Sequence, residues 1–140
     1  MSQIQKISHI GIAVKNLNDA INWYTNVLGL PLEGIEEVES ERVRVAFLKI
    51  GESRIELLEP MTEESVIAHF INKQGEGIHH IAFEVMDLKM RLSDLEQKGV
   101  RLIHTEPKQG AHHMDIAFLH PKSTGGVLLE LCQPQADGKE

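Results

Sequence analysis

The sequence has 140 residues, enough for one compact domain with a sizeable core but not for a second ordinary domain. Hydrophobic residues make up 41% and charged residues 25%, a balance that excludes a disordered chain. A formal net charge of -7 without a basic stripe argues against nucleic acid, because phosphate binding needs clustered Lys and Arg. No apolar run is long enough for a signal peptide or a membrane span, so we expect a cytoplasmic protein that binds no membrane.

The predicted elements of the first half are a strand, a helix and two more strands, with a short helix in the linker that follows. In chain order they are Ser8 to Val14, Leu17 to Leu28, Val43 to Ile50, Arg54 to Leu58 and Glu63 to Asn72. Asn16 is the expected N-cap of the first helix and Gly29 its stop. Thr62 is the expected cap of the linker helix.

The second half of the sequence repeats the first. His79 to Val85 resembles the first strand, and the helical pattern that starts at Leu88 lies between Asp87 as its cap and Gly99 as its stop. Two further strands are predicted at Ile116 to Leu119 and Val127 to Leu131. The repeat divides the single domain, residues 1–140, into module 1 at about 7–60, a linker at 61–77 and module 2 at about 78–134.

Each half offers one histidine in its first strand and one glutamate in its last strand. The pairs are His9 with Glu56 and His80 with Glu130. Strand alternation places each histidine among small neighbours, and each glutamate opposite two large apolar side chains. A carboxylate in an apolar strand is costly to bury unless it is paired or bound to a metal. The coincidence across the repeat therefore predicts that all four residues share one divalent-metal site.

The donor types restrict the choice of metal. Two imidazoles and one or two carboxylates suit Zn, Co, Mn, Ni or Fe in the divalent state, whereas calcium prefers oxygen ligands alone. The alternative is that the histidines bond to backbone carbonyls and the glutamates lie on solvated strand faces. That alternative is favoured for any one residue taken singly, but not for the four together. Cys132 is expected to be a small core residue.

Longer strings of the sequence carry a resemblance to known proteins. They are Ile55 to Pro60, Glu63 to Ser65, Gly75 to His80, Glu106 to Lys108, Phe118 to Lys122 and Gly126 to Glu130. With the two histidine-bearing strands, these strings resemble the methylmalonyl-CoA epimerase family, within the vicinal oxygen chelate superfamily. The resemblance covers the chain from Ile7 to Pro134.

The resemblance implies an α+β fold in which two βαβββ modules form an eight-stranded, cup-shaped mixed sheet around the metal, commonly in a homodimer. It implies His9, His80 and Glu130 as metal ligands, with Glu56 as a further one. The implied activity is a metal-dependent epimerisation at C2 of an acyl-CoA substrate, methylmalonyl-CoA, through a metal-stabilised enolate. We expect Glu130 or Glu56 to be the base. Val45 stands where some members have a second catalytic glutamate, which leaves the other acid/base group open.

Three other functions are compatible with this fold, because function depends on the site. A glyoxalase I-type lactoylglutathione lyase would use a similar metal and similar bases. A metal-free small-molecule binding protein, as in antibiotic resistance, would lack the metal ligands that are all present here. An extradiol dioxygenase would need Fe(II) with two histidines and one carboxylate, and the fourth candidate ligand, Glu56, argues against it.

Overall fold

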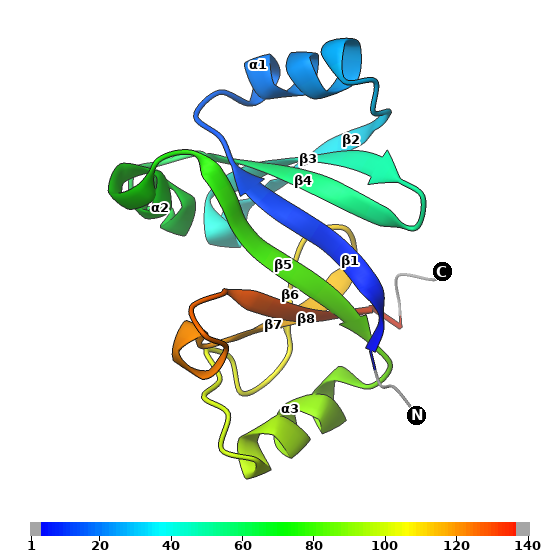
Figure 1. Ribbon diagram of the computed structural model, residues 1–140, viewed down its shortest axis with the longest axis vertical. Coiled ribbons are helices and arrows are strands. Elements are labelled where there is room, and N and C mark those ends of the chain that lie inside the picture. Colours follow the sequence, from blue (N-terminus) through cyan, green and yellow to red (C-terminus); the bar gives the residue numbers. More distant parts are fainter. Residues whose placement is uncertain (1–3, 137–140) are drawn as a thin grey trace. The chain divides into compact units, whose positions relative to one another are not determined.

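The computed structural model describes residues 4–136, which form eight strands interspersed with short helices (Figure 1). The strands are β1 (Ile4–Ala13), β2 (Leu32–Val38), β3 (Val43–Ile50), β4 (Ser53–Pro60), β5 (Gly77–Val85), β6 (Lys108–Gln109), β7 (Met114–Leu119) and β8 (Leu129–Pro134). The α-helices are α1 (Leu17–Asn22), α2 (Val66–Gln74) and α3 (Leu88–Gln97). The strands form a mixed sheet in the order β2-β3-β4-β1-β5-β8-β7-β6, which confirms the predicted pair of βαβββ modules.

The chain divides into two compact units. One holds residues 9–79, where β1 runs parallel to β4 and the antiparallel strands β4, β3 and β2 follow in turn. The other holds the described residues 4–8 and 80–136, where β5 runs parallel to β8 and the antiparallel strands β7 and β6 follow. Each unit therefore shows the same strand pattern, as the sequence repeat predicts.

In each unit, an amphipathic helix covers one face of the strands. In residues 9–79, α1 contributes Leu17 to a core with Leu48 and Leu57. In residues 80–136, α3 contributes Leu88 and Leu92 to the corresponding core. These apolar side chains occupy the helix-facing side of the strands, so the alternate residues of β1, β4, β5 and β8 face the other way.

The start of each helix is fixed by two side chains. Asn16 Oδ1 accepts a hydrogen bond from the Asp19 amide at 2.9 Å, and Asp87 Oδ1 accepts one from the Met90 amide at 3.1 Å. Both N-cap predictions are thereby confirmed. The last strand of each module adds a second contact, because Glu59 Oε2 accepts from the Leu17 amide and Gln133 Oε1 from the Leu88 amide, each at 2.9 Å. These bonds tie each helix to the strand that carries a candidate glutamate.

Several predicted boundaries differ from the structure. The helix predicted from Leu17 to Leu28 is α-helical only to Asn22 and continues as a π-helix, Trp23–Val27. The linker helix begins at Val66 because Ser65, and not Thr62, is its cap: the Ser65 hydroxyl accepts from the Ile67 amide at 3.1 Å.

Further differences concern the strands. The last strand begins at Leu129 and not at Val127, because Gly125 and Gly126 adopt φ of 74° and 97° in the preceding turn. Strands β2 and β6 were not predicted individually. No helix among residues 4–136 is long and apolar enough to cross a membrane.

Truncation of Leu57 tests how much the α1 core contributes to stability. Leu57 is fully buried on β4, so Leu57→Ala should lower the free energy of unfolding by about 2–5 kcal/mol through lost burial and a residual cavity. Val66→Ala is a control, because Val66 is 59% exposed and its truncation should cost less than about 0.5 kcal/mol. Urea denaturation of both variants measures the difference, and equal losses would contradict this placement of the core.

Candidate functional site

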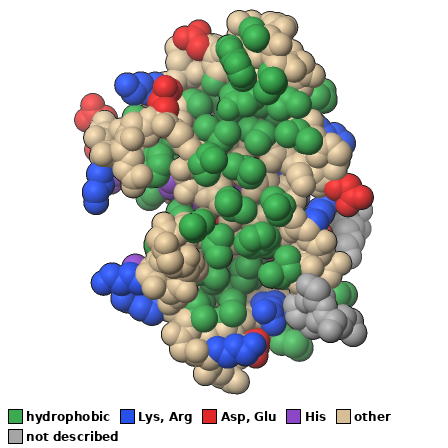
Figure 2. Space-filling model, in the orientation of Figure 1, with side chains coloured by type: hydrophobic (Ala, Val, Ile, Leu, Met, Phe, Trp, Pro, Cys, Tyr) green, Lys and Arg blue, Asp and Glu red, His purple; other side chains and the backbone are tan. Residues whose placement is uncertain are grey.

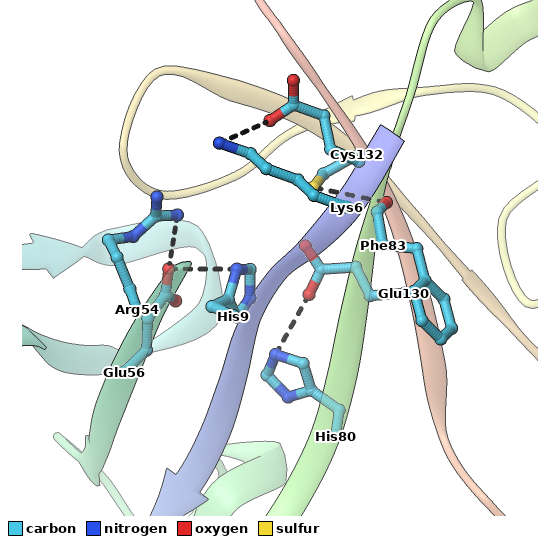
Figure 3. A network of polar contacts seen from close by, with 9 residues as sticks. Lys6, His9, Arg54, Glu56, His80, Phe83, Glu130 and Cys132 are labelled. Carbon is cyan, nitrogen blue, oxygen red and sulfur yellow. Dashed lines mark hydrogen bonds and ion pairs between the residues drawn. The ribbon is translucent and has the colours of Figure 1, made fainter. Parts of the chain in front are cut away.

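The first candidate pair lies within the unit of residues 9–79. Strands β1 and β4 pair so that His9 lies opposite Arg54 and Gly11 lies opposite Glu56. His9 Nδ1 is 3.3 Å from Glu56 Oε2, and both side chains are buried (Figure 3). Gly11 has no side chain to separate them, which agrees with the prediction that small neighbours leave room beside the histidine.

Arg54 is a third member of this group that sequence reasoning missed. Its Nη2 atom donates to Glu56 Oε2 at 3.0 Å, and only 12% of its side chain is exposed (Figure 3). The guanidinium carbon also lies 6.0 Å from the ring centroid of Phe47, on the neighbouring strand β3. Arg54 precedes Glu56 by two residues on the same strand, so alternation alone could have placed both side chains on one face.

The second candidate pair lies within the other unit, on strands β5 and β8. Ala82 lies opposite Glu130, and His80 Nε2 is 3.1 Å from Glu130 Oε1 (Figure 3). The Phe118 ring packs edge-on against the His80 ring, with 5.3 Å between centroids. Phe118 lies opposite Glu130 on β7, just as Phe47 lies opposite Glu56 on β3. The two pairs thus have equivalent aromatic neighbours in the two modules.

Three of these side chains form a group that could hold a metal ion. His9, His80 and Glu130 are all buried, and each offers one ligand atom, with these atoms all within 4.8 Å of one another. Two imidazole nitrogens and one carboxylate oxygen fit a divalent transition metal with positions left for other ligands. Glu56 is not in this group of three, so its role as a further ligand stays a prediction.

Three other histidines have structural contacts. His79 points away from the pair on β5 and β8: its ring packs edge-on against Phe70 of α2, with centroids 5.0 Å apart. His104 Nδ1 accepts from the Phe118 amide at 3.1 Å, and His120 Nδ1 accepts from the Lys122 amide at the same distance. These contacts give the three side chains structural roles.

Cys132 and Val45, which the sequence analysis also discussed, are both buried. Cys132 is fully buried, with its thiol 3.5 Å from the Phe83 carbonyl oxygen, as expected for a core residue. Val45 is 2% exposed on β3, where it lies opposite Glu36 on one side and Leu58 on the other. An aliphatic side chain cannot transfer a proton, so this position does not supply an acid/base group.

Comparison with known proteins gives consistent results. A family model described as the Glyoxalase/Bleomycin resistance protein/Dioxygenase superfamily matches residues 8–118. The mitochondrial methylmalonyl-CoA epimerase of Homo sapiens is 40% identical, over 91% of this chain and 73% of its own length. The ethylmalonyl-CoA/methylmalonyl-CoA epimerase of Cereibacter sphaeroides is 39% identical, over 93% and 98%.

The fold is also shared with a solved structure. A methylmalonyl-CoA epimerase in complex with methylmalonyl-CoA and NH4+ is 40% identical to this chain and superimposes with a TM-score of 0.91. The match covers 95% of this chain and 96% of that one. The similarity therefore includes both histidine-bearing strands and both glutamate-bearing strands, and is not confined to one module.

Proposed function

Because the chain belongs to the methylmalonyl-CoA epimerase family of the Glyoxalase/Bleomycin resistance protein/Dioxygenase superfamily, we propose that it inverts C2 of methylmalonyl-CoA. The observation that carries the proposal is the buried group of His9, His80 and Glu130 in a chain so similar to a structure with methylmalonyl-CoA bound. The fold alone would not be enough, since one fold supports several reactions.

The donor set supports a metal-dependent reaction. His9, His80 and Glu130 would hold a divalent ion such as Co, Zn, Mn or Ni. We propose Glu56, which lies 3.3 Å from His9, as a further ligand. A bound divalent ion would act as a Lewis acid on the oxygen that becomes negatively charged when C2 loses its proton. The same set of donors also serves Fe(II) oxygenases, so the close relatives, and not the donors, favour an epimerase.

Proton transfer is the part of the reaction that the protein's own carboxylates would perform. Inversion requires a base on one side of C2, within reach of the proton that it removes, and an acid on the other side that delivers a proton to the opposite face of the carbon. Glu56 and Glu130 occupy equivalent positions in the two modules, and we propose one of them as the base. Both carboxylates are buried, so bulk water does not compete strongly for the transferred proton.

The decisive experiment compares two substrates in deuterated water. We expect the metal-loaded protein to incorporate deuterium at C2 of racemic methylmalonyl-CoA and to leave the hemithioacetal of methylglyoxal and glutathione unchanged. Mass spectrometry of both reactions measures the result. Turnover of the hemithioacetal without exchange at C2 would instead identify a glyoxalase I-type lyase. Tight binding of a small molecule without metal uptake or turnover would identify a binding protein.

Two properties of the whole protein complete the proposal: a cytoplasmic location and assembly as a homodimer. Figure 2 shows many apolar side chains gathered on one face. Large apolar side chains are also exposed at Trp23, Val27 and Leu28, which follow α1 in the sequence. Large exposed apolar patches are typical of protein interfaces. We expect light scattering after size-exclusion chromatography to give the mass of two chains, whereas the mass of one chain would contradict the dimer.

A further inference from the structure

The ion pair between Arg54 and Glu56 is incomplete. Arg54 Nη2 donates to Glu56 Oε2, but Arg54 Nε is buried and has no hydrogen-bond partner. Glu56 Oε2 accepts this bond and also lies 3.3 Å from His9 Nδ1, so one carboxylate oxygen makes both contacts. The contacts that involve Glu56 are thus made by a single atom, although a carboxylate has two oxygens to offer.

An unpaired buried guanidinium N–H is unusual and calls for a physical explanation. The Nε and Nη2 atoms of an arginine form a fork whose spacing matches the two oxygens of a carboxylate, and such pairs are commonly bidentate. Glu56 is near enough to bond to one arm of this fork. In its present orientation beside His9, Glu56 offers no oxygen to the other arm. His9 and Arg54 therefore share one carboxylate oxygen, and Glu56 does not form the bidentate pair with Arg54 in this orientation.

We propose that Arg54 is a positioning residue that draws Glu56 away from the metal site. When Glu56 turns from His9 toward Arg54, its second oxygen can accept from Nε, and the buried donor gains its partner. The inference rests on the proposed function, because the metal site that competes with Arg54 is part of that proposal. Its consequence is that Glu56 is a weakly held ligand, available as a base.

The charges support the same role. The Arg54 guanidinium balances the Glu56 carboxylate within the pair, so Glu130 alone would offset one of the two charges of a divalent ion. The remaining positive charge is available to an anionic enolate. If Glu56 were instead a full ligand, both charges would be balanced before the substrate bound.

A double-mutant cycle read out by metal affinity tests the competition. Arg54→Met removes the guanidinium but keeps a long apolar side chain beside Phe47, and it frees Glu56 to bind the ion. We expect Arg54→Met to tighten metal binding. The ratio of metal affinities with methionine and with arginine at position 54 should be about tenfold larger when Glu56 is present than when it is replaced by glutamine. Both affinity ratios are measured by chelator competition titration. The four proteins needed are the wild type, the two single variants and the double variant.

The two affinity ratios separate competition from other effects of the arginine. Equal tightening in both backgrounds would mean that Arg54 acts only through its charge, and weaker metal binding by Arg54→Met would mean that it is a structural support; either overturns the inference. Arg54→Lys keeps the charge but has no fork, so its metal affinity should lie between those of the wild type and of Arg54→Met. A lysine variant that matches the wild type would also overturn it.

Arg44→Met is the matched control. Arg44 also pairs with a glutamate, since its Nη1 atom lies 3.2 Å from Glu59 Oε1, but neither residue belongs to the candidate site. We expect its metal affinity to equal that of the wild type. Failure of the wild type to bind a divalent metal would contradict the proposed function itself. Normal metal uptake and epimerisation with no coupling between Arg54 and Glu56 would contradict only this inference.

Discussion

His80→Ala protein is expected to bind its divalent metal at least about 100-fold more weakly than the wild type, because even second-shell substitutions cost about 10-fold to 100-fold. The value of kcat/KM for epimerisation should fall by about 1000-fold, which corresponds to losing about 4 kcal/mol of transition-state stabilisation. The imidazole is one of three buried candidate ligands, and its removal also takes away the partner 3.1 Å from Glu130. Elemental analysis after dialysis and steady-state kinetics measure the two losses.

The neighbouring histidine provides the control for this variant. His79 lies on the same strand but packs against Phe70, so His79→Ala should keep metal content and kcat/KM within about threefold of the wild type. Loss of the edge-on ring contact should lower the free energy of unfolding by about 1 kcal/mol. Circular dichroism shows whether both variants fold. Equal loss of metal in the two variants would mean that damage to β5, and not loss of a ligand, causes the effect.

The features predictable from sequence are those set by local chemistry or by the repeat. Asn16 and Asp87 cap their helices through side-chain bonds to amides three residues away, and such bonds depend only on neighbouring residues. The alternation of the first strand in each half places His9 and His80 on the faces that lack the large apolar side chains. Because the halves repeat, each prediction made for one module supports the corresponding prediction for the other.

Other elements depend on tertiary context, which a local pattern does not contain. The sequence of strand β2 gives only a weak strand signal, because Glu33, Gly34 and Glu36 are poor strand formers. The strand is defined by its pairing with β3. Strand β6 has only two residues, Lys108–Gln109, and exists through its bridges to β7. The π-helix at Trp23–Val27 fits the same apolar spacing as an α-helix, so periodicity could not distinguish the two.

The residues of the candidate site also divide into those that the repeat made predictable and one that it did not. The histidines and glutamates were predictable because the repeat presents each of them twice. Arg54 has no counterpart of this kind, since the position two residues before Glu130 is Leu128. The two otherwise equivalent pairs therefore differ in charge: a buried arginine accompanies Glu56, and none accompanies Glu130 within its own strand. This asymmetry gives a physical reason why two glutamates at matched positions could have different roles.

That difference leads to opposite expectations for two conservative variants. Glu56→Gln should keep its fold and its contact with Arg54, because an amide oxygen accepts from Nη2 as a carboxylate oxygen does. It should still bind metal through His9, His80 and Glu130 but lose about 100-fold to 10,000-fold in deuterium exchange at C2, the usual contribution of a general base. Glu130→Gln should instead lose metal first, because a neutral amide replaces the only carboxylate in the group of three.

Exchange rates divided by the amount of bound metal separate the two roles. Glu59→Gln is the control on the same strand, since Glu59 caps α1 and the glutamine keeps an oxygen for the Leu17 amide. Its exchange per bound metal should equal that of the wild type. If Glu130→Gln bound metal normally and lost exchange, Glu130 would be the base and Glu56 the displaceable partner. Full exchange by both variants with normal metal content would exclude both carboxylates, and the proton at C2 would then need an acceptor outside the two matched strands.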